Sequence, residues 1–385
     1  MEGTSYFDNA ATTFPKPEMV YTFMDQFYRE CGVNVGRGQY KLASKAAALV
    51  SETRELMLEL LSAKNKQVVF THTATEAINL ILRGISIPEH CNVFISPFEH
   101  NSVTRVLNHI QELQDIRIHH LSVDKMTFQY NLAEIKSQFS THNPSLVIVN
   151  HASNVCGLVA PIQEICNLAK TFNALTVVDL CQTAGLIDIT LNSDNIDYAV
   201  FAGHKALYGP FGVAGFVSSN TIKLTPLIYG GTGIDSSDQH MPKSAPERYE
   251  AASPNIMAIA GLNAALKWLL QTGVQTIREK EEQNHSKLLT ALRKHPNIRI
   301  VGEQSGTATI GVVSCEFKGY SNDEIGRILS EYGIAVRTGL HCSPLAHQFL
   351  GTYPSGSVRF SVSYFNNDND FEALNKALNI ISESV

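Results

Sequence analysis

Asp197-Tyr198-Ala199-Val200-Phe201-Ala202-Gly203-His204-Lys205 is followed directly by Ala206-Leu207-Tyr208-Gly209-Pro210. The short apolar run predicts a buried strand that ends in small residues and delivers Lys205 into a cleft. Burial disfavours the ammonium form, and a neutral amine is what forms a Schiff base with an aldehyde cofactor. Lysines at strand ends are more often solvated and structural, so this segment needs support from elsewhere in the chain.

A second apolar run provides that support. Thr176-Val177-Val178-Asp179 predicts another buried strand, which closes on an acid and is followed three residues later by Gln182. Pyridoxal phosphate needs an acid on its pyridinium nitrogen and a lysine on its aldehyde. The two strand ends therefore predict a site for this cofactor, with Lys205 as its anchor.

Composition restricts the class of protein. A chain of 385 residues and 42.3 kDa predicts one large domain and one smaller domain. Hydrophobic residues at 44% and charged residues at 17% are typical of a globular protein. The net charge of -6 and the pI near 6.2 provide no basic patch, so we expect no nucleic-acid partner.

The cysteines and the N-terminus predict a cytoplasmic protein without a metal site. Seven scattered cysteines contain no Cys-x-x-Cys pair, which favours reduced thiols over disulfides or structural zinc. Met1-Glu2-Gly3-Thr4-Ser5 has neither the basic region nor the apolar core of a signal peptide. No run of about 18 apolar residues occurs, so we expect no membrane span.

Predicted strands alternate with predicted helices, which indicates an α/β fold with a mostly parallel sheet covered on both faces. Ligands then bind at the carboxyl ends of the strands. Six polar residues fall just beyond these ends and are expected to share one crevice: Thr75, His100, Asn154, Asp179, Gln182 and Lys205. Residues 212–217 are expected to return antiparallel to the strand before Lys205, because the connection is too short for a crossover.

A phosphate site is predicted where a strand over residues 67–70 runs into Thr71-His72-Thr73-Ala74-Thr75-Glu76. The free N–H groups and positive dipole end of a helix that starts there suit a phosphate. In the alternative interpretation, Thr75 and Glu76 form no more than an N-cap with an acidic first turn.

The C-terminal part predicts a smaller α+β domain. Helical periodicity from Ile256 to about His295, broken near Gly273, leads to strands predicted at 308–316, 334–337 and 358–363. We expect a large domain over residues 1–274 and a small domain over 275–385. Residues 1–30 are expected to form an arm that packs with the small domain.

Arg337-Thr338-Gly339-Leu340-His341-Cys342-Ser343-Pro344 is a second candidate for chemistry. A thiol on a loop is a nucleophile if an imidazolium or another cation favours its anion, and both His341 and Arg337 are close in sequence. Cys342 is otherwise a small core residue. Arg359 on a late strand is suited to gripping a carboxylate, or to a surface ion pair.

These motifs together resemble the cysteine desulfurases of the class V aminotransferase group, also called the cysteine desulfurase and selenocysteine lyase family. The motifs follow the family order over nearly the whole chain: Tyr6-Phe7-Asp8-Asn9-Ala10-Ala11-Thr12-Thr13, Thr75-Glu76-Ala77-Ile78-Asn79, Glu99-His100, Ser153-Asn154, Asp179 with Gln182, Gly203-His204-Lys205 and Arg337-Thr338-Gly339-Leu340-His341-Cys342.

The resemblance implies a pyridoxal-phosphate homodimer of fold type I, in which each motif has a role. Lys205 carries the cofactor, Asp179 pairs with its pyridine nitrogen and Gln182 bonds its ring oxygen. His100 stacks on the ring and is expected to be catalytic, together with Lys205 and Cys342. The phosphate is held by the Ala74 N–H, by Thr75 and His204, and by Ser253 from the partner subunit. The substrate, L-cysteine, is bound by Asn154, Arg337 and Arg359. Lys205 then removes the Cα proton, and the Cys342 thiolate takes the sulfur as a persulfide while L-alanine leaves.

Two positions depart from the family pattern. Ala202 stands where the family usually has serine before Gly-His-Lys, and Ala74 stands where it often has threonine, so two phosphate hydroxyls are missing. The compact segment around Cys342 resembles the branch that passes sulfur to an acceptor protein. Two other interpretations stay open: a related lyase or aminotransferase acting on selenocysteine or a cysteine conjugate, and a non-catalytic scaffold on the same fold.

Overall fold

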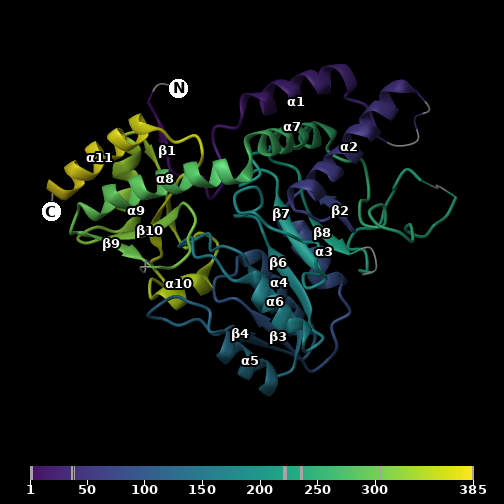
Figure 1. Ribbon diagram of the computed structural model, residues 1–385, viewed down its shortest axis with the longest axis horizontal. Helices are drawn as coiled ribbons and strands as arrows, with labels where there is room; N and C mark the ends of the chain where they lie inside the picture. The colour runs from purple at the N-terminus through teal and green to yellow at the C-terminus, as the bar shows by residue number, and fades with distance from the viewer. Residues whose placement is uncertain are drawn as a thin grey trace.

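The computed structural model describes residues 3–35, 38, 40–219, 223–234, 237–302 and 306–383. In this part of the chain, a sheet of seven strands forms the larger body, and a four-stranded sheet lies beside it (Figure 1). The large sheet has the order β2-β8-β7-β6-β5-β3-β4. Its strands are β2 (Lys66–Thr71), β3 (Cys91–Ile95), β4 (Ile116–His120), β5 (Pro144–Asn150), β6 (Leu175–Asp179), β7 (Tyr198–Ala202) and β8 (Ala214–Ser219).

The large sheet is parallel except where β8 lies between β2 and β7 and runs antiparallel to both. The predicted return of residues 212–217 beside the strand before Lys205 is therefore confirmed, with bounds at Ala214–Ser219. The mostly parallel α/β sheet is confirmed as well.

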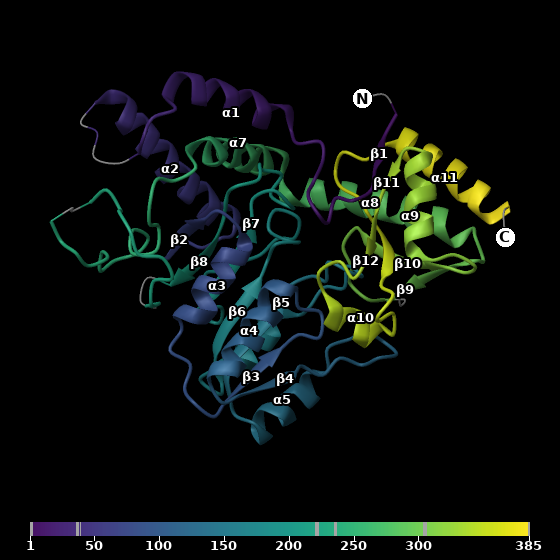
Figure 2. The ribbon, with the colours of Figure 1, turned by 180° about the vertical axis from the view of Figure 1, so that it is seen from behind.

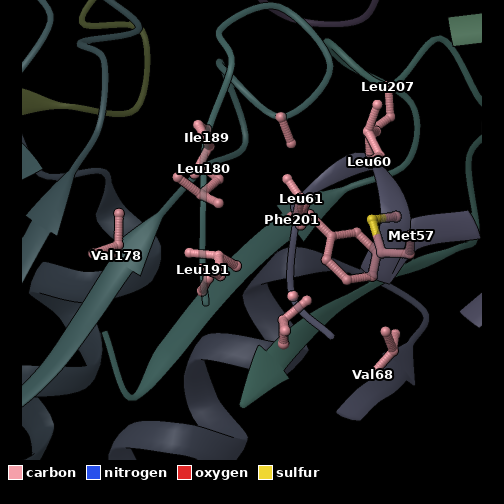
Figure 3. Packing of buried hydrophobic residues seen from close by; sticks show 14 of the residues in the cluster. Met57, Leu60, Leu61, Val68, Val178, Leu180, Ile189, Leu191, Phe201 and Leu207 are labelled. Carbon is pink, nitrogen blue, oxygen red and sulfur yellow. The ribbon is translucent and has the colours of Figure 1, made fainter. Parts of the chain in front are cut away.

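Side chains of β7 alternate between two apolar cores, because successive residues of a strand face opposite sides of its sheet. Phe201 packs in one core with Met57 and Leu61 (Figure 3), whereas Val200 belongs to the other core. Helices cover both faces, which explains why the strands are continuous apolar runs. The first core takes in α2 (Lys41–Leu60), α5 (Leu132–Thr141), α6 (Ile162–Lys170) and α7 (Ile256–Thr272), and the second takes in α3 (Ala74–Gly84) and α4 (Asn101–Leu113).

The smaller sheet is antiparallel, with the order β12-β13-β10-β9, and has its own core. Its strands are β9 (Ile298–Val301), β10 (Val312–Phe317), β12 (Arg337–Gly339) and β13 (Ser357–Ser361). Helices α8 (Val274–Arg293), α9 (Asn322–Glu331) and α11 (Asp368–Glu383) gather around it, as Figure 2 shows. The short α10 (Pro344–Leu350) follows β12.

The first residues of the chain reach both sheets. β1 (Ser5–Tyr6) pairs in parallel with β11 (Ile334–Ala335) beside the small sheet. The chain then crosses to α1 (Glu18–Cys31), which lies along α7 (Figure 1). The boundary at residue 274 stays a proposal, supported by the separate cores of the two sheets. None of the helices described here has the length and apolar character needed to cross a membrane.

Candidate active site

A cavity of about 250 Å³ opens at the carboxyl ends of the parallel strands. The expected meeting of the six polar residues in one crevice is observed, since all six line this cavity. Its lining comprises Thr73, Ala74, Thr75, His100, Ser102, Asn150, Ala152, Asn154, Asp179, Cys181, Gln182, Ala202, His204 and Lys205. The strand ends meet because parallel neighbours present the same end at the same edge of the sheet.

The backbone around Lys205 is held tightly. A Cβ on Gly203 would lie 2.6 Å from the Val213 carbonyl oxygen, so only glycine fits between β7 and the returning strand. The Lys205 carbonyl accepts hydrogen bonds from the Tyr208 N–H at 2.8 Å and from the Thr13 hydroxyl at 3.0 Å. The lysine is therefore presented from a rigid turn into the cavity.

Asp179 ends β6 and is held beside the lysine strand. Its Oδ1 accepts a hydrogen bond from the Cys181 N–H at 2.8 Å, which orients the carboxylate. Gln182 follows on the same turn, and its Nε2 donates to the Ala10 carbonyl at 3.0 Å. The N-terminal arm therefore contacts a residue of the cavity wall, which no local sequence pattern indicated.

His100 presents a neutral ring to the cavity. It is the N-cap of α4, and its Nδ1 accepts a hydrogen bond from the Ser102 N–H at 3.0 Å. Burial, together with the positive charge of Lys205, lowers the pKa of His100 to about 4. An uncharged flat ring can stack on a flat cofactor.

The neighbouring Glu99 is a residue for which the sequence predicted no role. It is fully buried, and its Oε1 accepts a hydrogen bond from the Asn150 N–H at 2.7 Å. Burial, and then the charge of Asp179, raise the pKa of Glu99 to about 8, so this carboxyl is largely protonated at neutral pH. In the sequence, Glu99 lies between a buried strand and His100. An acid at such a position is usually an exposed loop residue, so the pattern alone does not indicate burial.

The start of α3 lines the cavity where an anion site is expected, but its N-cap differs from the one considered. Thr73, not Thr75, is the N-cap, and its hydroxyl accepts a hydrogen bond from the Glu76 N–H at 3.1 Å. The alternative in which Thr75 serves only as the cap is therefore wrong, and Thr75 lines the cavity from the first turn. Backbone N–H groups of a first helical turn lack intrahelical partners and suit an anion.

His204 adds an unsatisfied polar atom at the same cavity. Its Nδ1 is buried without a hydrogen-bond partner in the described structure, and its ring stacks on Phe211 with centroids 4.4 Å apart. Burial, with the charges of Lys205 and Lys16, lowers its pKa to about 3. A buried ring nitrogen without a partner is unfavourable, and a phosphate oxygen beside it would satisfy it. The residues present therefore fit a phosphate-bearing cofactor.

The loop that carries Cys342 is bonded onto the cavity wall from the smaller sheet. The Cys342 carbonyl accepts from the Asn101 N–H at 2.7 Å, and the Asn154 amide donates to the His341 carbonyl at 2.7 Å. His341 and Cys342 have φ of 48° and 60°, in the left-handed region. Such strained backbone persists where surrounding contacts enforce it. Of the seven cysteines, Cys342 alone is not buried.

The expectation that His341 supplies a cation for the Cys342 anion is wrong. His341 is buried, and its Nε2 pairs with the Ser357 hydroxyl at 3.0 Å. Burial, and then the charge of Arg359, lower the pKa of His341 far below its usual value. The cation beside the sulfur is Arg337, whose Nη2 lies 3.8 Å from Cys342 Sγ.

Arg359 is buried deeply at the junction of the two sheets. It is 1% exposed and donates to Asp8 Oδ1 at 2.7 Å and to the Asn154 carbonyl at 2.9 Å. The alternative of a surface ion pair is therefore wrong. The Asn154 side chain is bonded on both sides by the cysteine loop, because its oxygen also accepts from the Ser343 hydroxyl at 2.8 Å.

Ser253 lies elsewhere in the same chain. It lines a second hollow of about 830 Å³ with His72, Glu76 and Tyr249, and does not line the cavity of Lys205. The two cavities adjoin at the start of α3, because Thr73 lines one and Glu76 the other. Within one chain, the structure does not bring Ser253 to Lys205.

Comparison with known proteins places this geometry in a family. The model of the family described as Aminotransferase class-V matches residues 5–374. A probable cysteine desulfurase of Aeropyrum pernix is 31% identical, with 98% of this chain and 94% of the relative covered. One from Methanothermobacter thermautotrophicus is 28% identical, with the same coverage of both chains.

Solved structures agree with the sequence relatives. The apo structure of cysteine desulfurase from Thermococcus onnurineus NA1 superposes with a TM-score of 0.92 at 26% identity, over 99% of this chain and 95% of the other. The cysteine desulfurase CsdA (S-sulfonic acid) from Escherichia coli has a TM-score of 0.86 at 26% identity, with the same coverage. The chain therefore belongs to the class-V aminotransferase family, in its cysteine desulfurase group.

Proposed function

We propose that this protein is a pyridoxal-phosphate-dependent cysteine desulfurase, which converts L-cysteine to L-alanine and transfers the sulfur to Cys342. One observation carries the proposal. The sole cysteine that is not buried sits on a strained loop, and that loop is hydrogen-bonded to the wall of the cavity that holds Lys205 and Asp179. A lysine and a thiol reaching one substrate are the two groups that this reaction needs.

The cavity residues supply the contacts that the cofactor needs. Lys205 would hold its aldehyde carbon, Asp179 its pyridine nitrogen, Gln182 its ring oxygen and His100 one face of its ring. The phosphate would be bound by the Ala74 N–H, by Thr75 and by the unpartnered ring nitrogen of His204. When bound, pyridoxal phosphate supplies an electron sink for the charge left after a Cα proton is removed.

The reactive steps belong to two side chains of the protein. The Lys205 amine accepts the Cα proton of L-cysteine in the cavity that Lys205 lines. The Cys342 thiolate then attacks the substrate sulfur, so an S–S bond forms as the C–S bond breaks, and L-alanine is released after protonation. Arg337 stabilises the attacking anion through its contact with Cys342 Sγ, and Arg359 provides a buried cation for the substrate carboxylate.

A homodimer completes the proposed site. Ser253 lines a hollow beside the start of α3. In a dimer, the phosphate-binding end of the second subunit's cavity would lie against this hollow. Apolar side chains that line this hollow are exposed, with Ile228 52% and Ile234 53% exposed. Exposed apolar side chains at a hollow favour an interface. The partly exposed loop of Cys342 supports transfer of the sulfur to an acceptor protein, in the cytoplasm.

The experiment that tests the function uses L-cysteine with and without reductant. With reductant, the protein should release L-alanine and sulfide in equal amounts. Without reductant, mass spectrometry after one turnover should find one added sulfur on the peptide that contains Cys342. Cys342→Ala should still bind cofactor and L-cysteine, while alanine formation collapses. Normal turnover by Cys342→Ala would favour the related lyase or aminotransferase instead, and a colourless protein that takes up no cofactor would favour the scaffold.

A further inference from the structure

Asp8 occupies one side of the buried guanidinium of Arg359. Arg359 Nη2 donates to Asp8 Oδ1 at 2.7 Å, and Nη1 donates to the Asn154 carbonyl at 2.9 Å. Arg359 Nε is also buried, and it has no hydrogen-bond partner in the described part of the chain. The guanidinium therefore keeps one donor that no described residue uses, and its charge is already balanced by Asp8.

The N-terminal arm holds Asp8 in this position. The Asp8 carbonyl accepts from the Tyr6 hydroxyl at 3.2 Å and from the Ala11 N–H at 3.1 Å. The next residue on the arm, Asn9, donates from its amide to the Ser361 carbonyl at 2.9 Å. The Asp8 side chain is 20% exposed, whereas that of Arg359 is 2% exposed. This pair is therefore held by the fold, unlike a mobile surface ion pair.

The ion pair of Asp8 and Arg359 affects how tightly a carboxylate ligand binds to Arg359. A guanidinium in a poorly solvated site attracts a carboxylate strongly when it is unpaired, because water screens the interaction little. A second carboxylate that arrives beside an existing pair gains the attraction of Arg359 and meets the repulsion of Asp8 at short range. Asp8 therefore weakens every ligand that binds through a carboxylate, including an amino-acid product.

We propose that Asp8 is a counter-charge that weakens the hold of Arg359 on the substrate and product carboxylate, so that the product L-alanine leaves readily. This inference builds on the proposed function, in which Arg359 binds that carboxylate. Asp8 acts through Arg359 and is a positioning residue. Asp8 lowers the affinity for the substrate as well as the affinity for the product. The enzyme benefits because the product is released faster.

The test compares the holoenzyme with its Asp8→Asn variant, using L-alanine and L-alaninamide as probes in calorimetric titrations. Asp8→Asn should bind L-alanine about tenfold more tightly, the factor that corresponds to a change of about 1.4 kcal/mol. Its affinity for L-alaninamide, which lacks the carboxylate, should not change. In turnover of L-cysteine, KM and kcat should both fall, as product release slows. Asp8→Ser makes the same comparison if Asp8→Asn does not fold.

Tyr6→Phe is the matched control, because it removes a hydrogen bond to the Asp8 carbonyl and leaves both charges in place. It should leave the affinity for L-alanine unchanged. Equal or weaker L-alanine binding by Asp8→Asn, the same gain for L-alaninamide, or an equal gain in Tyr6→Phe would each overturn the proposal. If the parent protein forms no alanine from L-cysteine, the proposed function fails. The comparison of L-alanine with L-alaninamide still measures whether Asp8 weakens carboxylate binding at Arg359.

Discussion

Arg337 Nη2 lies 3.8 Å from Cys342 Sγ, which makes an arginine of the smaller sheet the cation beside the half-exposed thiol. Arg337 belongs to the short strand β12, and Cys342 follows on the turn that leads to α10. The left-handed backbone at Cys342, with φ of 60°, aims the side chain within reach of the guanidinium. Strand position and turn geometry together set this contact.

Arg337→Gln should slow the reactions of Cys342. A nearby guanidinium stabilises a thiolate, and the thiolate is the reactive form. We expect about a three- to tenfold slower alkylation by iodoacetamide at neutral pH, which corresponds to about 1 kcal/mol for a partly exposed charge contact. The measurement is the rate of mass increase on the Cys342 peptide. Arg327→Gln, in α9, is the control and should alkylate like the parent; an unchanged rate in Arg337→Gln would remove Arg337 from the mechanism.

The proposed sharing of Ser253 between subunits is testable by complementation. In a heterodimer of one Ser253→Ala chain and one Lys205→Ala chain, the surviving Lys205 site receives Ser253 from its partner only if the residue crosses the interface. That site should then retain the cofactor and turn over at the parent rate per intact site, so the dimer keeps about half of the parent activity. If Ser253 serves its own chain, the activity per intact Lys205 site should be as low in the heterodimer as in the Ser253→Ala homodimer.

Restoring hydroxyls at Ala74 and Ala202 should tighten cofactor binding. Both residues line the cavity, Ala74 at the first position of α3 and Ala202 at the end of β7. One added hydrogen bond of about 1 kcal/mol predicts roughly a fivefold lower dissociation constant for Ala202→Ser and for Ala74→Thr. Titration of the apoprotein with pyridoxal phosphate measures this constant. Ala206→Ser, outside the cavity lining, should have no effect, and no change in all three variants would contradict the assigned phosphate site.

The raised pKa of Glu99 predicts that the free energy of unfolding depends on pH. Its pKa rises from 4.5 to about 8 on folding, so the folded state holds a proton that the unfolded chain releases. The stabilisation that Glu99 provides is complete below about pH 4.5 and is lost as the pH rises to about 8. Relative to the parent, Glu99→Gln should therefore gain free energy of unfolding over this range, by at most about 1.4 kcal/mol per pH unit.

Chemical denaturation between about pH 5 and 9 measures this difference, with Glu59→Gln on the exposed face of α2 as the control. The buried histidines titrate in both proteins and cancel in the comparison. For His151, burial lowers the pKa to about 4, so its own contribution is present above about pH 6.5 and is lost as the pH falls. A flat difference between Glu99→Gln and the parent would mean that Glu99 is ionised in the fold.

Local pattern was sufficient for the central strands and for the residues at their ends. Val177 and Val200 lie in buried runs whose ends carry Asp179 and Lys205, and register pairs Asp179 with Val200. It was insufficient for β4 and β9, which are short, lie at the sheet edges and are largely half-exposed. Polar side chains interrupt the apolar residues of both strands: β4 contains Arg117, His119 and His120, and β9 contains Arg299. Edge strands bury one face only, so their apolar runs are interrupted.

What the sequence determined by itself was the set of reactive groups and the edge of the sheet where they meet, since strand ends follow from the alternation of buried strands and helices. Tertiary structure alone decided the environment of those groups. Asp8 is 351 residues from Arg359, and the Asn154 amide bonds a carbonyl 187 residues away. The neutral His341 and the protonated Glu99 follow from burial between such distant segments. Charge state depends on desolvation and on neighbouring charges, and both are properties of the assembled fold.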